Sequence, residues 1–340
     1  MLRRFVLVAA SLGTLAFGGV SLAQTSPRAP GILSYPLLTP EPQASESFPL
    51  LFSDSPETPR SPGVLYRDVV TGKARVVAYH ANGLREDARV LILARPSGAQ
   101  DVTFTTLRRG SAITRGADPV IGQQTLLRFF ASGPLPSRVV PPSATAVLFD
   151  SGIVAPSGVA SVMLDVETQA PLELSVVLLS ARDARNAAAL LPTLPVLPRD
   201  ANHQRGTFPN AVRTLRVNVS SVPSRLVIGG GPDPVLVGVD ALTGEVQRLA
   251  GNYGLSYEFE FAGASDLVLA ASARGGAYRG SVFVVDGERR SQLLVGDGQA
   301  LKDSAVPEVL WNVRSDVFRL SFVPSNASSL PLALIFYKRR

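Results

Sequence analysis

The fold class follows from one stretch of the sequence, Val64-Leu65-Tyr66-Arg67-Asp68-Val69-Val70-Thr71-Gly72-Lys73-Ala74-Arg75-Val76-Val77-Ala78-Tyr79. It contains two short runs rich in valine and tyrosine, residues that favour β-strands. Between the runs, residues 68–73 bring together aspartate, threonine and glycine, which favour turns. We therefore predict two strands joined by a hairpin turn within residues 68–73.

Similar strand-like runs recur along the chain at a spacing of about ten residues. We place them at residues 89–93, 102–107, 144–149, 159–167, 172–179, 212–219, 225–228, 235–239, 245–249, 256–261, 266–271, 281–285, 292–295, 317–323 and 332–337. Only residues 120–131 and 183–191 favour helices. A parallel α/β fold would need a long helix after each strand. We expect an all-β protein made of two tandem antiparallel β-sandwich domains with one or two short helices.

The chain divides into four predicted segments. Residues 1–24 form a signal peptide, residues 25–49 a proline-rich tether, residues 50–196 the first sandwich and residues 197–340 the second. Proline lacks a backbone donor, so the tether is expected to be extended and to have no packed core. The expected core positions of the sandwiches are Phe149, Leu164, Val177, Phe261, Leu269, Phe283, Phe322 and Leu334.

The first residues indicate where the protein works. Arg3 and Arg4 precede an apolar stretch at residues 5–17, and Ser21 and Ala23 stand at the small-residue positions of a cleavage site. This is the pattern of a secretory signal peptide. The alternative is a membrane anchor, but a span needs about 20 continuous apolar residues. We expect an exported protein of the periplasm or cell surface, with no transmembrane segment once the signal is removed.

The composition limits the possible chemistry. The chain has no cysteine, which excludes disulfides, thiolate metal sites and a thiol nucleophile. Hydrophobic residues make up 46% and charged residues 18%, which favours well-buried sheets. The formal charge is +6, and the loss of Arg3 and Arg4 with the signal leaves +4. A modest, dispersed excess of this kind predicts weak attraction to anionic envelope polymers and no nucleic-acid partner.

Several short motifs stand out along the chain. They are residues 51–57 (LFSDSPE), 63–68 (GVLYRD), 79–82 (YHAN), 203–209 (HQRGTFP), 251–254 (GNYG) and 274–280 (RGGAYRG). Together they resemble the motifs of a family of uncharacterised secreted bacterial proteins. Some members of that family carry an additional N-terminal module named after a copper amine oxidase, where this chain has its proline-rich segment. The resemblance implies a location in the bacterial envelope. It also suggests a role as a surface-layer accessory protein.

Metal chemistry would have to use the two histidines, His80 and His203. If the fold brings them together, they could bind copper or zinc or relay a proton. The alternative is that each ring caps a loop by hydrogen bonding to the backbone. Glu258 and Glu260 alternate along one predicted strand and could form a carboxylate pair, although such a face is more often solvated.

Two glycine-flanked tyrosines suggest a binding surface. Tyr253 follows Asn252 in one segment, and Tyr278 lies in the other between glycines, with Arg274 close by. Exposed aromatic rings beside polar donors suit stacking on sugars or contact with proteins. The alternative is that both tyrosines plug the ends of a sandwich. Arg205, close to His203, completes the predicted binding set.

We therefore expect an exported, non-enzymatic structural or binding protein of the cell envelope. It would dock on an envelope protein, such as a surface-layer protein, or on a wall glycan, would need no cofactor, and could form a homo-oligomer. The alternative is a metal-binding, copper-type oxidoreductase or superoxide dismutase-like protein that uses His80 and His203.

Overall fold

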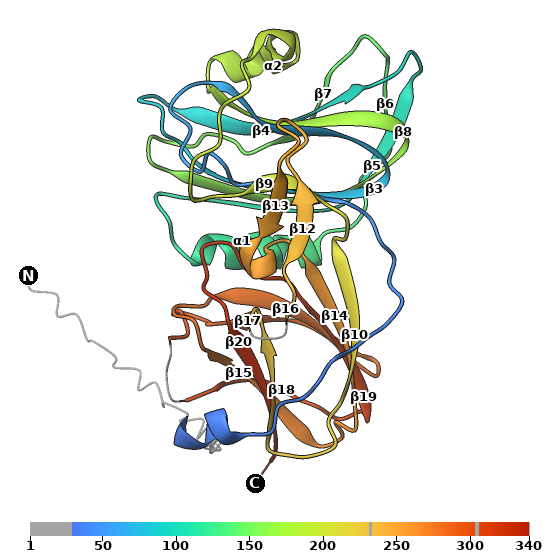
Figure 1. Ribbon diagram of the computed structural model, residues 1–340, viewed down its shortest axis with the longest axis vertical. Coiled ribbons are helices and arrows are strands. Elements are labelled where there is room, and N and C mark those ends of the chain that lie inside the picture. Colours follow the sequence, from blue (N-terminus) through green and yellow to red (C-terminus); the bar gives the residue numbers. More distant parts are fainter. Residues whose placement is uncertain (1–28, 231–232, 303–305, 340) are drawn as a thin grey trace, which may run out of the picture.

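The computed structural model describes residues 29–230, 233–302 and 306–339. The predicted signal peptide lies outside these residues. Strands dominate and helices are short, so the prediction of an all-β fold is confirmed. Figure 1 shows two β lobes stacked along the long axis, which we call the N-terminal lobe and the C-terminal lobe.

The N-terminal lobe is one ten-stranded sheet. Its strands are β2 (Leu50–Ser53), β3 (Gly63–Ala81), β4 (Ala88–Pro96), β5 (Val102–Thr114), β6 (Arg138–Val140), β7 (Ala146–Asp150), β8 (Val159–Ser180), β9 (Arg205–Phe208), β12 (Leu236–Val239) and β13 (Val246–Leu249). The first half of β8 pairs with β5 and its second half with β4, while β3 pairs with both halves. The sheet therefore folds over itself around one apolar core.

The predicted hairpin at residues 68–73 is wrong, because β3 continues through it as a single strand. Gly72 has φ 75°, and the pairing register with β8 shifts between Val70 and Gly72. A bulge of this kind bends a strand without reversing it, and glycine adopts the positive φ without strain. The predicted strands at 159–167 and 172–179 are likewise one strand, which bends together with its partner.

The C-terminal lobe is a sandwich of a six-stranded and a four-stranded sheet. The larger has the order β1 (Glu41–Pro42), β10 (Val212–Asn218), β14 (Ser256–Ala262), β19 (Val317–Phe322), β16 (Gly280–Asp286) and β17 (Arg289–Val295). The smaller has the order β11 (Ser224–Ile228), β20 (Leu332–Lys338), β15 (Leu267–Ala273) and β18 (Glu308–Asn312). All pairs are antiparallel except β10 with β14 here and β2 with β3 in the other lobe.

Six of the eight predicted core residues are buried. They are Leu164, Val177, Phe261, Leu269, Phe322 and Leu334. The ring of Phe261 meets Phe336 of the opposite sheet at a centroid distance of 4.9 Å. Phe149 and Phe283 are only partly buried. Phe283 belongs to the outer face of its sheet, where its ring stacks 6.4 Å from Phe130, so the register predicted for that strand was one residue off.

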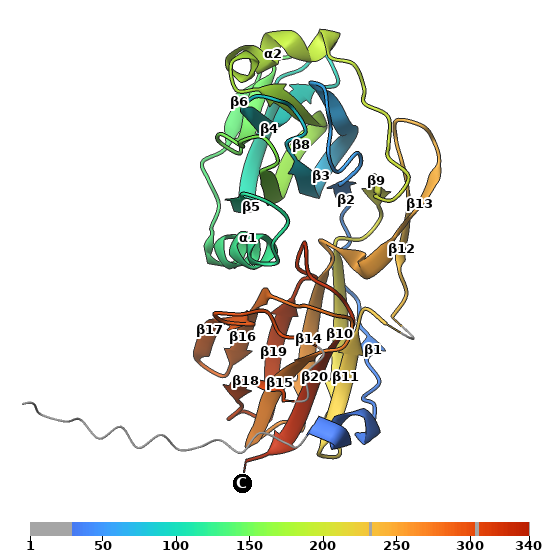
Figure 2. The ribbon, with the colours of Figure 1, turned by 90° about the vertical axis from the view of Figure 1, so that its left-hand side faces the viewer.

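Helix α1 (Val120–Ala131) has the predicted bounds and lies between the lobes (Figure 2). The Gln123 side chain donates hydrogen bonds to the carbonyls of Gly280 and Val295 in the C-terminal lobe. Gly110 allows the helix to approach β5, because a Cβ there would lie 2.0 Å from the Thr125 carbonyl oxygen. The remaining helical pieces are η1 (Ala29–Ser34), η2 (Asp183–Asn186), α2 (Ala187–Leu190), η3 (Leu191–Thr193) and η4 (Ala250–Asn252).

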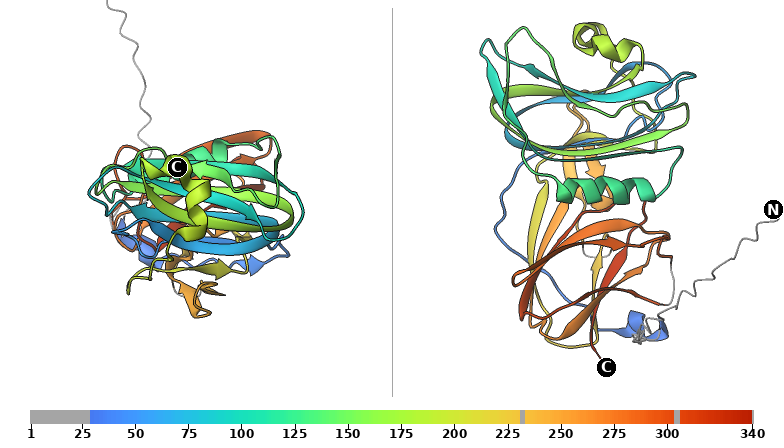
Figure 3. Two further views of the ribbon diagram at one scale, coloured as in Figure 1. Left: turned by 90° about the horizontal axis from the view of Figure 1, so that it is seen from above. Right: turned by 180° about the vertical axis from the view of Figure 1, so that it is seen from behind.

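The predicted boundary at residue 197 does not separate the lobes. Strands β9, β12 and β13 lie after it in the sequence, yet they extend the N-terminal sheet through the pairing of β9 with β2. Figures 1 and 2 show the β12–β13 arm reaching from the C-terminal lobe onto the other one, and the view from above in Figure 3 shows this orange segment at the edge of the molecule. The two lobes are therefore interlocked and are not tandem units.

The prediction of a free tether is wrong for residues 29–42, which pack on or pair with the C-terminal lobe, whereas residues 43–47 are exposed. Ile32 is fully buried against Ala270, Ala333 and Ile335 on the outer face of the four-stranded sheet. Residues 41–42 then pair with β10. Prolines are compatible with this path because the segment lies along sheet edges, where missing donors cost little.

We expect Ile32→Ala to lower the free energy of unfolding by about 2–4 kcal/mol, because it leaves a cavity beneath the N-terminal segment. Urea denaturation would measure this change. The matched control is Leu33→Ala, since Leu33 is 62% exposed and its loss should change the stability by less than about 0.5 kcal/mol. Equal effects of the two substitutions would contradict the packing of this segment.

Candidate functional site

An apolar pocket opens at one edge of the C-terminal sandwich, beneath residues 36–43, which we call the strap. At one end, the strap exchanges backbone hydrogen bonds with β11: Leu38 donates to the Arg225 carbonyl, and Arg225 donates to the Pro36 carbonyl. At the other end, residues 41–42 pair with β10, and Gln43 donates to the Thr214 carbonyl. The strap therefore bridges the two sheets where the sandwich would otherwise be open.

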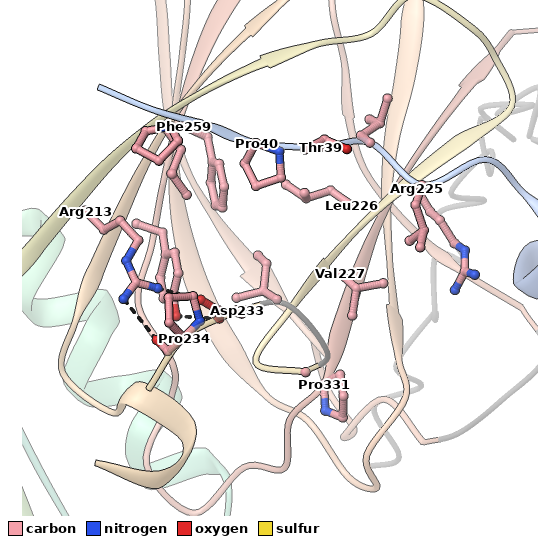
Figure 4. A pocket seen from close by; sticks show the side chains of 17 residues that line it. Thr39, Pro40, Arg213, Arg225, Leu226, Val227, Asp233, Pro234, Phe259 and Pro331 are labelled. Atoms are coloured by element: carbon pink, nitrogen blue, oxygen red, sulfur yellow. Dashed lines mark hydrogen bonds and ion pairs between the residues drawn. The ribbon is translucent and has the colours of Figure 1, made fainter. Parts of the chain in front are cut away.

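The pocket has a volume of about 540 Å³, within the usual range for small-molecule sites. Apolar side chains from both sheets form its walls, among them Leu215 and Phe259 on one side and Leu226 and Ile228 on the other. Figure 4 shows Thr39 and Pro40 of the strap beside Phe259 and Leu226. The pocket thus extends the space between the two sheets, and its walls are apolar like those of the sandwich core.

One end of the pocket is closed by a polar network. Arg213 pairs with Asp233 and lies over the ring of Tyr257, 5.4 Å from its centroid. The Tyr257 hydroxyl donates to Asp233 at 2.7 Å, and the amide of Asn252 donates to that hydroxyl. Burial, with Asp233 nearby, raises the pKa of Tyr257, so the phenol stays neutral. The polar groups of this network thus hydrogen bond or pair with one another and do not need a ligand.

Arg225 lies at the opposite end of the pocket (Figure 4). Its Nε donates to the Tyr35 carbonyl at 3.1 Å. Its two terminal nitrogens have no partner among the residues that the structure describes, and the side chain is partly exposed. The pocket therefore combines apolar walls with one available positive charge at its edge, which suits an amphiphile with an acidic head group.

The predicted binding residues are not brought together on an exposed surface. Tyr278 is 1% exposed and stacks on Phe322, while Tyr253 is partly buried and donates to the Ser328 carbonyl at 2.8 Å. Asn252 is buried, and its side-chain oxygen Oδ1 accepts a hydrogen bond from the Leu236 backbone N–H. The prediction of an exposed patch was therefore wrong, and the alternative, tyrosines that plug the core, describes these residues.

Of the two arginines in the predicted set, Arg205 differs from the expectation. Arg205 is 2% exposed and pairs with the buried Asp240 at 2.9 Å, so it is not available at the surface. Its guanidinium also donates to the carbonyls of Leu65 and Leu197. Arg274 is partly exposed and its backbone donates to the Pro331 carbonyl.

Both histidines contact the loop after β2, but among the described residues no group hydrogen bonds to both of them. His80 is fully buried between the Ser53 hydroxyl, 2.9 Å from Nε2, and the Pro56 carbonyl, 3.0 Å from Nδ1. His203 lies between Glu57 at 2.7 Å and Asp200 at 2.9 Å. Desolvation lowers the pKa of His80 to about 4. Among the described residues, no group of three or more potential ligands has the geometry to hold a metal ion.

The strap pocket does not follow from the sequence prediction, which places residues 36–43 within a free tether. A signal was present: Ile32, Leu37 and Leu38 are apolar residues spaced among the prolines. In a free tether such residues would have no packing partners. Ile32 and Leu38 are buried in the structure, whereas Leu37 is exposed and lines the pocket mouth.

No helix in the described ranges is both long and apolar enough to cross a membrane. No family model matches the sequence, and no curated protein matches it. Among solved structures, the chain is similar to the crystal structure of vicilin from Solanum lycopersicum (tomato), at 10% identity over 85% of each chain. The TM-score of that pair is 0.16, so this likeness supports no inference about the present protein.

Proposed function

We propose that this chain is an exported binding protein of the cell envelope, and that its ligand is an amphiphile whose acyl chain enters the strap pocket. The observation that carries the proposal is an inter-sheet pocket of about 540 Å³ with apolar walls and, at its edge, Arg225, whose terminal nitrogens have no partner in the described part of the chain. Export itself rests on the signal-like sequence of residues 1–24.

The edge of β11 argues for an acyl chain and against a peptide strand. Arg225 uses its outward backbone groups for the strap, and the Gly229 N–H donates to Asp233 at 2.9 Å. In a strand, alternate residues direct their backbone N–H and C=O groups to the same edge. Between Arg225 and Gly229, whose outward groups are already hydrogen bonded, only Val227 therefore has outward backbone groups available to a peptide. A single residue offers too short an edge for strand addition, whereas an acyl chain needs only apolar walls.

We expect dodecanoate to bind the purified protein and dodecanol to bind more weakly, because only dodecanoate has a charge for Arg225. Isothermal titration would measure both. Leu226→Trp should fill the pocket and abolish binding, and Arg225→Gln should weaken dodecanoate binding by about tenfold, as loss of a charged hydrogen bond does.

Val237→Trp is the control, because Val237 is 46% exposed on the β12–β13 arm and lies outside the pocket. It should bind dodecanoate as the wild type does. Failure of the wild type to bind, or unchanged binding by a folded Leu226→Trp variant, would contradict the proposal. Thermal denaturation of each variant establishes that it is folded.

A further inference from the structure

A second cleft, of about 500 Å³, lies at the junction of the two lobes. Its walls come from β3, β5 and β8 of the N-terminal lobe and from β10 and β14 of the C-terminal lobe, with residues 132–134 after α1 at one side. It shares no lining residue with the strap pocket. Ligand sites occur preferentially at such junctions between packed units.

Charged side chains of both signs line the cleft, and their formal charges balance. Its charged lining residues are Lys73, Arg75, Arg108, Glu46, Asp165 and Glu258. Two opposite pairs are already formed, Lys73 with Glu46 at 2.6 Å and Arg75 with Asp165 at 2.6 Å. These pairs neutralise four of the six groups, which leaves one cation and one carboxyl group for a ligand.

The remaining cation is Arg108 of β5. Its guanidinium lies 5.8 Å from the ring centroid of Phe129. Within the described ranges it has no hydrogen-bond or ion-pair partner, and the side chain is exposed. Its planar set of donors is therefore available to the cleft.

The remaining carboxyl group belongs to Glu258 of β14. It accepts a hydrogen bond from the Ser321 hydroxyl on one oxygen, Oε2, and its other oxygen has no partner in the described part of the chain. Burial raises the pKa of Glu258, while the hydrogen bond and the nearby Arg75 and Arg108 oppose that rise. Arg108 of the N-terminal lobe and Glu258 of the C-terminal lobe both line the cleft, so each lobe contributes one charged group to the same space.

We propose that this cleft binds a neutral saccharide unit of a wall polymer, held between Arg108 and Glu258. A sugar hydroxyl both donates and accepts, so neighbouring hydroxyls can satisfy a guanidinium and a carboxyl group together. A ligand with a net charge would meet a like-charged group in the cleft whichever sign it carried. The Phe48 ring, at the cleft wall, adds an apolar surface against which the face of a pyranose can pack.

The test uses three tetrasaccharide probes with the full mature chain in isothermal titration. Two are neutral, tetra-N-acetylchitotetraose and cellotetraose, and the third is the anionic tetragalacturonate. We expect at least one neutral probe to bind more tightly than tetragalacturonate. Arg108→Gln and Glu258→Gln should each weaken that binding by about tenfold or more, as loss of a charged hydrogen bond does.

Glu260→Gln is the matched control, because Glu260 lies two residues along the same face of β14 but pairs with Arg319, outside the cleft. It should leave saccharide binding unchanged, as should Leu226→Trp in the strap pocket. Absence of binding by both neutral probes, tighter binding of tetragalacturonate, or an equal loss in Glu260→Gln would each overturn the proposal. Dodecanoate binding by the same samples reports separately on the strap pocket.

Discussion

Replacement of Arg75 by methionine is expected to lower the free energy of unfolding by about 3–5 kcal/mol, because it leaves the carboxylate of Asp165 without its partner. Arg75 is 3% exposed and binds both oxygens of Asp165, at 2.6 and 2.9 Å. Its third nitrogen donates across the lobe junction to the carbonyls of Ala211 and Gly254 and to the Ser256 hydroxyl. One side chain thus holds β3 and the C-terminal lobe together.

Urea denaturation of Arg75→Met, Asp165→Asn and the double variant would measure this coupling as a double-mutant cycle. The double variant should recover part of the stability, since it removes both buried charges. Arg319→Met is the control, because the Arg319 side chain is 73% exposed and its pair with Glu260 should contribute less than about 1 kcal/mol. A small effect of Arg75→Met, similar to that of the control, would contradict the role assigned to Arg75.

Acidification should destabilise the protein through His80. Burial holds the pKa of His80 at about 4, whereas the ordinary value is 6.5. Between pH 6.5 and 4 the unfolded chain therefore takes up a proton at this position and the folded chain does not. Stability contributed by neutral His80 is present above pH 6.5 and is lost as the pH falls towards 4, by a total of about 3 kcal/mol.

The variant that isolates this effect is His80→Gln, whose amide can hydrogen bond without titrating. Its stability, measured by urea denaturation from pH 7 to pH 4, should decline by about 3 kcal/mol less than that of the wild type. The comparison is needed because burial raises the pKa of Asp54, which acts in the opposite direction over acidic pH. His203→Gln should retain the decline due to His80. Parallel profiles for wild type and His80→Gln would contradict the prediction.

The sequence was sufficient to predict the features that depend on local pattern. The all-β class, the helix at residues 120–131 and most core residues follow from spacing and composition, because alternation and helical periodicity record which side chains face inward. Phe283 shows the limit of this reasoning. An apolar residue on the outer face looks the same in sequence as one in the core, and only the position of α1 explains its burial.

Other features depend on contacts between distant segments. The local sequence of residues 68–73 is compatible with either a hairpin or a bulge. The bulge forms because β3 pairs along its length with β8, which lies about ninety residues later and bends at the matching point. The burial of Tyr278 and Arg205 likewise depends on partners in other parts of the chain. The strap pocket and the cleft at the junction of the two lobes are each lined by segments that lie far apart in the sequence. No local sequence pattern predicts that these segments come together.

The path of the chain between the lobes also governs when this protein can fold. The strap needs β10 and β11 for its pairing, and β11 needs β20. Strand β20, at residues 332–338, is an inner strand of its sheet and pairs with β11 on one side and β15 on the other. A nascent chain therefore lacks an inner strand of the four-stranded sheet until residues 332–338 have been synthesised. Such pairing between distant segments slows folding, so the C-terminal lobe should stay unfolded until then, and an unfolded segment is the form in which a polypeptide can pass through a narrow translocation channel.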